Sequence, residues 1–427
     1  MTAPGELGNA TIPKRSTFSP LALTRLVWIL WLVLLVALGF RIITFALGDL
    51  LQQTNPSLAV LCDSGQSVAR VLVAEQLRQE DEARVDDAVS NARAALRSNP
   101  FSARALSVLG DVSVGKNDAA QATILFQRAN RAALRDLTPQ IWLLQSEINA
   151  GDIAAVMERV DVILRANDPR VLQPLLTALI PLVTDERFRS HFVGLLQANT
   201  PWRKSVLRDV TRGTKDIRGL NALFTSLQAS NAPPDTDEMK EYLERLVREG
   251  WLDQAYLAWS KFLPPERFEN MDYLYNARFQ YPLSNLPFDW LMPEIQGAII
   301  AVTTESSLRI LNIDFFGGRV RFANVSHILA LAPGSYKFSG QERAQNLLND
   351  RGLRWRIYCM EDPNGSSLGV SDVLKGERAW RELSIDFEVP EDNCRYQNLL
   401  LELPAQVVLD TEISGGVSYS ALKLQPQ

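Results

Sequence analysis

An apolar stretch near the start of the chain limits where the rest of the protein can reside. Residues 26–47 carry no charge apart from Arg41 and include the run LVWILWLVLLVALGF. A helix of this length spans about 33 Å, enough to cross the hydrocarbon core of a bilayer. Trp28 and Trp31 suit one membrane interface, and the long Arg41 side chain can extend to the other. The sequence therefore predicts one transmembrane signal-anchor helix over residues 23–48.

The flanking charges predict the orientation of this helix. Lys14, Arg15 and Arg25 precede it, whereas residues 48–69 contain no lysine or arginine. Positive residues beside a membrane helix stay cytoplasmic, so most of the chain is expected outside the cytoplasm. A single-pass protein of a bacterial inner membrane that faces the periplasm fits this pattern. A eukaryotic type II membrane protein remains an alternative.

A cleaved signal peptide is the competing interpretation of the same stretch. Ala46-Leu47-Gly48 loosely resembles a cleavage site, but the apolar stretch continues well beyond the hydrophobic region of an ordinary signal peptide, which favours an uncleaved anchor. Residues 1–22, rich in Thr, Ser, Pro and Gly, are expected to form a disordered cytoplasmic tail. Residues 49–66 are expected to be a linker.

Composition narrows the function classes. The 427 residues suggest two or three domains, and 46% hydrophobic with 22% charged residues is ordinary for a globular protein. A net charge of -5 disfavours a dedicated nucleic-acid partner. Two histidines and three cysteines leave little material for a histidine-rich or cysteine-rich metal site. We expect no metal site, no cofactor and no nucleic-acid partner.

The next part of the chain is helical and repetitive. Similar residues recur 34 positions apart, as in the pairs Ala88 and Ala122, Ala95 and Ala129, Leu109 and Leu143, Asp118 and Asp152, Ala120 and Ala154, and Phe126 and Val160. Within Ala103–Asp136, the positions Leu106, Leu109-Gly110, Ala122, Phe126 and Ala129 resemble the tetratricopeptide-repeat motif. The match weakens after Pro169 and returns in a last pair of helices between Met239 and Phe262.

The tetratricopeptide resemblance implies an α-solenoid over residues 67–265. Such arrays stack helix-turn-helix units and present a concave surface that binds protein segments. Protein partners on that surface are therefore the first expected function. A helical bundle without repeats is the alternative fold. Residues 266–287 are expected to be a second linker.

After that linker the pattern changes to short alternating runs separated by Gly and Pro turns. The expected strands are Ala298–Thr303, Leu308–Phe315, His327–Leu331, Ser335–Ser339, Leu353–Met360, Trp380–Val389, Asn398–Leu403 and Val417–Leu424. Because no long helix separates them, the strands are expected to pair antiparallel. Residues 288–427 thus read as an antiparallel β-sandwich of jelly-roll size.

Several motifs of this part resemble carbohydrate-binding-module and galactose-binding-like jelly rolls. Those motifs are Phe322-Ala323-Asn324-Val325, Ala332-Pro333-Gly334-Ser335-Tyr336-Lys337-Phe338, Leu353-Arg354-Trp355-Arg356-Ile357, Gly376-Glu377-Arg378-Ala379-Trp380 and Ile385-Asp386-Phe387. The resemblance implies a jelly roll with polysaccharide as a possible ligand. The order of anchor, repeats and sandwich is also similar to bacterial exopolysaccharide-associated envelope proteins. The chain lacks the aromatic-Asp-Asp stretch that lies near a structural calcium in many such modules.

Strand alternation selects the candidate glycan-binding residues. Leu353, Trp355, Ile357 and Cys359 share one expected face, and Arg354, Arg356 and Tyr358 share the other; Asp386 alternates with Ile385 and Phe387 in a later strand. Guanidinium, phenol and carboxylate groups can hydrogen-bond sugar hydroxyls. Arg354, Arg356, Tyr358 and Asp386 are therefore the glycan-binding candidates. A solvated strand face is the simpler interpretation of the same pattern.

Cysteines and carboxylates complete the list of candidates. Cys359 and Cys394 both fall in the sandwich, where an oxidising compartment favours a disulfide over two buried thiols, and Cys62 is left over. A glycan-active enzyme would need two positioned carboxylates, for which Asp314, Asp386, Glu388 and Glu402 are available. We predict that the chain has no catalytic residues. We expect it to be a membrane-tethered scaffold for envelope polysaccharide assembly or export. A scaffold that binds only proteins, with a structural sandwich, is the alternative.

Overall fold

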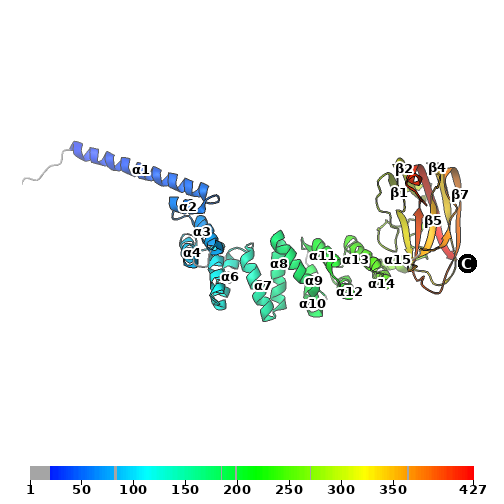
Figure 1. The fold of residues 1–427 in the computed structure, drawn as a ribbon, viewed down its shortest axis with the longest axis horizontal. Helices are drawn as coiled ribbons and strands as arrows, with labels where there is room; N and C mark the ends of the chain where they lie inside the picture. The colour runs from blue at the N-terminus through cyan, green and yellow to red at the C-terminus, as the bar shows by residue number, and fades with distance from the viewer. Residues whose placement is uncertain (1–19, 81–83, 184, 198–199, 270, 363–364) are drawn as a thin grey trace, which may run out of the picture. The chain divides into compact units, whose positions relative to one another are not determined.

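The structure is a computed structural model that describes residues 20–427 except 81–83, 184, 198–199, 270 and 363–364. It divides into two compact units, residues 1–166 and 167–427 (Figure 1). The expected fold class is confirmed, with helices first and antiparallel sheets after them. The single helical domain expected over residues 67–265 is instead divided after Ala166, close to where the 34-residue pattern weakens. The expected tail, residues 1–22, lies almost entirely outside the described residues.

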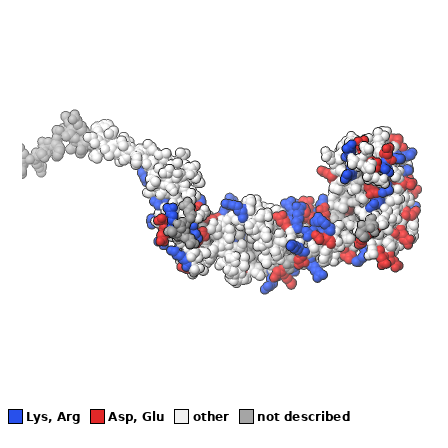
Figure 2. Space-filling model, in the orientation of Figure 1, with Lys and Arg blue, Asp and Glu red and all other residues white. Residues whose placement is uncertain are grey.

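The regular structure of the first unit is helical over its described residues. Its helices are α1 (Pro20–Leu51), α2 (Pro56–Cys62), α3 (Ser67–Glu80), α4 (Val85–Ser98), α5 (Ala103–Gly115), α6 (Ala119–Ala132), α7 (Leu137–Ala150) and α8 (Ile153–Ala166). Within the described chain, one segment, Trp28–Leu51 of α1, is long and apolar enough to cross a membrane, and Figure 2 shows it largely without charged surface. The expected linker over residues 49–66 is wrong in part, because α2 lies within it.

The 34-residue period corresponds to successive helical hairpins. Asp118 caps α6 by accepting a hydrogen bond from the Gln121 amide at 3.0 Å, and Asp152, 34 residues later, accepts one from the Ala155 amide at 3.1 Å in front of α8. The close approach of α5 and α6 depends on Gly110, where an added Cβ would lie 2.7 Å from the Phe126 ring. The small residue on one helix thus makes room for the large one on the next.

The second unit begins with more helices. They are α9 (Pro169–Leu182), α10 (Glu186–Gln197), α11 (Arg203–Gly213), α12 (Ile217–Gln228), α13 (Thr236–Arg248), α14 (Leu252–Phe262) and α15 (Pro265–Glu269). Helices α9, α11 and α13 pack in one row, and α10, α12 and α14 in a second row. Tyr242 of α13 is fully buried and stacks on Phe224 of α12 with ring centroids 4.0 Å apart. The last expected helical pair is therefore present as α13 and α14.

The rest of the second unit is a two-sheet β-sandwich. Its strands are β1 (Ala298–Glu305), β2 (Leu308–Arg319), β3 (Val325–Leu329), β4 (Gly334–Leu348), β5 (Arg354–Cys359), β6 (Ser367–Val370), β7 (Gly376–Val389), β8 (Gln397–Glu402) and β9 (Glu412–Pro426), with a 3-10 turn at Val408–Thr411. One sheet has the order β1-β2-β9-β4-β7 and the other β3-β8-β5-β6, with antiparallel pairing in both. Strand β6 is the strand that the alternation did not predict.

The segment expected to link helices and sandwich is part of the sandwich core. Leu274, Ala277 and Phe279 are buried with the inward residues of both sheets. Asp289 holds this segment together: its side chain accepts hydrogen bonds from the Ser284 amide at 3.0 Å and the Trp290 amide at 2.8 Å. The linker expected over residues 266–287 is therefore wrong.

Candidate functional site

The outer face of the four-stranded sheet carries most of the predicted candidates. Burial alternates along β5, so Trp355, Ile357 and Cys359 enter the core, as the sequence indicated. Arg354, Arg356 and Tyr358 lie on the opposite, half-exposed face. The strand register places them beside Glu402, Leu400 and Asn398 of β8. Asn398 and Leu400 were not among the predicted site residues. Because they alternate with buried residues of β8, the sequence pattern could have assigned them to the same face as Glu402.

These side chains form a connected polar network, which we call the β5–β8 face (Arg354, Arg356, Tyr358, Asn398 and Glu402). The Arg354 Nε and Nη2 donate to Glu402 Oε1 at 3.0 and 2.8 Å, and Arg356 Nη1 lies 4.0 Å from Glu402 Oε2. The Arg356 guanidinium lies over the Tyr358 ring, 4.5 Å from its centroid. Asn398 Nδ2 donates to the Tyr358 hydroxyl at 2.7 Å. The network fixes donors, acceptors and one aromatic ring on a single surface.

Asp386 does not belong to this face. It lies on β7, an edge strand of the five-stranded sheet, where it is exposed and its carboxylate accepts from the Gln427 side chain. The four glycan-binding candidates are thus divided between the two sheets. Alternation assigns a residue to a face of its own strand, but it does not reveal which sheet that strand joins.

The candidate carboxylates of an enzyme are dispersed by the strand order. Asp386 and Glu388 project from β7, whereas Asp314 lies on β2, with β4 and β9 between them. Glu402 is in the other sheet, where it is paired with Arg354. Asp314 and Glu402 therefore lie apart from the other two carboxylates, whereas Asp386 and Glu388 are two residues apart on the same exposed face of β7.

Both sandwich cysteines point into the core, and the structure joins them in a disulfide. Their Cα atoms lie 4.9 Å apart, and the bond links Cys359 at the end of β5 to the loop before β8. Both residues are almost fully buried, and Gln397 Nε2 donates to the Cys394 carbonyl at 2.5 Å. Cys62 is free and half-exposed.

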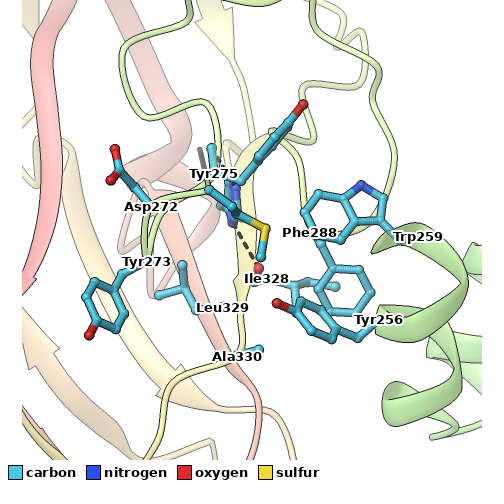
Figure 3. Close-up of a pocket in the computed structure, with 11 residues that line it drawn as sticks. Tyr256, Trp259, Asp272, Tyr273, Tyr275, Phe288, Ile328, Leu329 and Ala330 are labelled. Atoms are coloured by element: carbon cyan, nitrogen blue, oxygen red, sulfur yellow. Dashed lines mark hydrogen bonds between the residues drawn. The ribbon is translucent and has the colours of Figure 1, made fainter. Parts of the chain in front are cut away.

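An aromatic pocket of about 410 Å³ opens beside β3. Figure 3 shows Tyr256 and Trp259 of α14 with Phe288 on one side of β3, and Asp272 with Tyr273 on the other. Trp259 and Phe288 are buried, whereas Tyr273 is 53% exposed. Aromatic rings and a carboxylate can receive a sugar ring and its hydroxyls. The sequence signal for this pocket was the aromatic density of DYLYNARFQY, which is unusual for a linker.

His327 lies under this pocket and is almost completely buried. Its Nδ1 is 2.9 Å from the Ile328 carbonyl and its Nε2 is 3.1 Å from the Tyr275 carbonyl. Burial lowers the pKa of His327 to about 4, although Asp289 and the two carbonyls act in the opposite direction. The folded protein therefore holds a neutral imidazole, which can donate to only one of these carbonyls.

We expect the stability of the sandwich to fall in mild acid because of His327. The unfolded ring binds a proton near its ordinary pKa of about 6.5, whereas the folded ring does so only near 4, so acidification favours unfolding. The loss between about pH 7 and pH 5 should be roughly 2 kcal/mol. Urea unfolding midpoints of the wild-type protein and His327→Gln at both pH values test this. If the stability of the two proteins depends equally on pH, the prediction is contradicted. Burial raises the pKa of Glu342, so this residue changes stability with pH in the opposite direction. Comparing the two proteins at each pH removes that contribution.

Comparisons with known proteins give low similarities. No family model and no curated protein matches the chain. A solved structure described as "CBM4 structure and function" is 14% identical and covers 36% of this chain and 99% of its own, with a TM-score of 0.29. The tetratricopeptide protein YrrB, described as having an unusual peptide-binding site, is 13% identical. The match covers 48% of this chain and 90% of YrrB, with a TM-score of 0.25. The type IV pilus biogenesis factor PilW is 13% identical. The match covers 57% of this chain and 96% of PilW, with a TM-score of 0.22.

Proposed function

We propose that this chain is a non-enzymatic scaffold tethered to a bacterial inner membrane, with its bulk in the periplasm. The helical hairpins recruit protein partners, and the sandwich binds polysaccharide during envelope polysaccharide assembly or export. The observation that carries the glycan part is the β5–β8 face, where Glu402 pairs with Arg354 and Arg356, and Tyr358 is contacted by Arg356 and Asn398. The apolar length of α1 and the positive residues before it support the anchor and its orientation.

The chemistry of the β5–β8 face suits a hydroxyl-rich ligand. Guanidinium groups donate several hydrogen bonds in one plane, and Asn398 offers both donors and an acceptor. Among the described residues, the buried Arg356 Nε and Asn398 Oδ1 have no hydrogen-bond partner. Both atoms are shielded from solvent, so sugar hydroxyls would instead reach the partly exposed guanidinium groups of Arg354 and Arg356, while the Tyr358 ring can support the apolar side of a sugar.

The hairpins of the first unit support a role in protein binding. Some of their apolar side chains are exposed instead of packed, including Phe101 at 81%, Ile141 at 46% and Ile148 at 50%. Stacked helical hairpins offer extended surfaces to other proteins, and exposed apolar side chains can contribute to such contacts. The separation of Asp314 and Glu402 from the carboxylates of β7 supports the non-enzymatic part of the proposal.

The glycan proposal predicts that Arg356→Ala combined with Tyr358→Ala weakens polysaccharide binding. Each lost contact nets about 0.5–1.5 kcal/mol, so the double variant should bind roughly 5- to 150-fold more weakly. Folding should persist because both side chains lie outside the core. Affinity electrophoresis of the full chain in detergent measures the change. The polysaccharides tested are acidic and neutral and include those of the organism that encodes the chain.

Two matched variants sharpen this test. Asp386→Ala removes a polar group from the opposite sheet and should leave binding unchanged. Tyr273→Ala alters the aromatic pocket, and a loss of binding confined to this variant would move the glycan site from the β5–β8 face to the pocket.

A scaffold that binds only proteins is the second candidate function. The observation that favours it is that Arg354 and Arg356 already share Glu402 as a counter-charge, which gives the β5–β8 face a structural role without any ligand. If wild-type protein binds none of the polysaccharides, this candidate replaces the first.

A further inference from the structure

The short helix α2 exposes its large apolar residues and buries its small ones. Its sequence PSLAVLC contains no charge, and Pro56 and Ala59 are its buried residues. Leu58 and Leu61 are 47% and 80% exposed. A helix surrounded by water would bury leucine in preference to alanine. The outward face of α2 therefore fits an apolar surrounding.

Contacts with α1 place α2 at the end of the candidate membrane span. Gly48 lies directly against α2 and the residue after it, since an added Cβ would be 3.3 Å from Asp63 Cβ and 3.5 Å from the Ala59 carbonyl. The same Asp63, whose side chain is 5% exposed, pairs with Arg41 at 3.3 Å. Arg41, the one charged residue within residues 26–47, is thus neutralised by an ion pair with a residue that packs at the end of α1.

Only residues 52–55 separate α1 from α2, so the apolar surrounding closest to hand is the membrane that α1 crosses. Asn55 fixes this turn, because its side chain accepts a hydrogen bond from the Leu58 amide at 3.2 Å. Leu50, in the last turn of α1, is also 74% exposed. No lysine or arginine is present between Gly48 and Ala69, so the contact would rest on apolar burial without attraction to anionic lipids.

We infer that α2 is a second membrane contact, lying in the interface of the leaflet from which α1 emerges with Leu58 and Leu61 turned into the lipid. This inference rests on the proposed membrane anchor. The ligand is the bilayer itself. The consequence is that the helical hairpins start at a fixed depth against the membrane surface instead of on a free linker.

Site-directed nitroxide labelling tests the inference on the full chain in vesicles of phosphatidylethanolamine and phosphatidylglycerol. In a Cys62→Ser background, single cysteines replace Leu61, Leu35 of α1 and Gln76 of α3, all of which are exposed. Collision rates with oxygen, which concentrates in lipid, and with a water-soluble nickel chelate are compared. We expect the oxygen-to-nickel ratio at position 61 to be several-fold above that at 76 and below that at 35. A second label at Leu58 should give the same order.

The alternative outcomes are distinct. A label at position 61 that behaves like the label at 76 would place α2 in water and overturn the inference. A label at 61 that neither oxygen nor nickel reaches would mean that protein, such as a second copy of the chain, covers α2, which also overturns it. If the label at 35 is as accessible to nickel as the label at 76, α1 does not cross the bilayer, and the proposed anchor fails instead.

Discussion

Replacing Trp290 by alanine is expected to destabilise the second unit by about 3–5 kcal/mol, the usual cost of removing a large buried aromatic side chain. Trp290 is fully buried and connects the segment before the sandwich with both sides of the core. Its Nε1 donates to the Asn276 carbonyl at 3.0 Å, and its ring lies 5.2 Å from His327 and 6.0 Å from Trp355. The variant therefore leaves a cavity and removes one of the two hydrogen bonds to the Asn276 carbonyl, which keeps the bond from the Phe279 amide at 2.9 Å.

Calorimetry of the full chain in detergent measures this effect. For a domain of this size, each kcal/mol moves the midpoint by about 2–4 °C, so the sandwich transition should fall by roughly 6–20 °C. Trp380→Ala is the matched control, because Trp380 is 39% exposed. The Arg343 guanidinium lies over its ring, 4.7 Å from the ring centroid. That variant should cost about 1 kcal/mol or less. Similar losses in the two variants would show that Trp290 does not join the segment to the core.

Replacing Cys359 and Cys394 together by alanine is the second large expected effect. The disulfide closes a loop with a sequence separation of 35, and removing a crosslink of this kind costs about 2–4 kcal/mol. Alanine is the suitable replacement because both cysteines are buried and alanine introduces no unpaired hydroxyl. A reducing agent should lower the midpoint of the wild-type protein and leave that of the double variant unchanged.

Non-reducing peptide mapping of protein isolated from cells tests both the bond and its compartment. A linked peptide pair containing Cys359 and Cys394 is expected, because disulfides persist in the periplasm and are rare in the cytosol. Cys62→Ser serves as the control, since Cys62 is free and its replacement should leave the mapped pair intact. Complete alkylation of both sandwich cysteines without reductant would contradict the disulfide and weaken the case for a periplasmic location.

The sequence alone was sufficient for the features that depend on periodicity. A long apolar stretch predicted the α1 span, and the 34-residue spacing located equivalent residues such as Asp118 and Asp152 in successive hairpins. Two-residue alternation assigned Trp355 to the core and Arg356 to the outer face of β5. These predictions succeed because helices and strands repeat their side-chain directions with fixed periods of 3.6 and 2 residues.

Tertiary structure decided what no local period encodes. Asp386 follows the expected alternation, but the pairing of β7 with β4 places it on the other sheet from Arg356. Residues 271–290 lack a regular period, yet Phe279 and Trp290 fill the core between the sheets. The chain reaches these positions because burying large aromatic side chains outweighs the absence of regular backbone pairing, provided that groups such as Asp289 satisfy the local amides. Such packing depends on distant residues, and so it became visible only in the folded molecule.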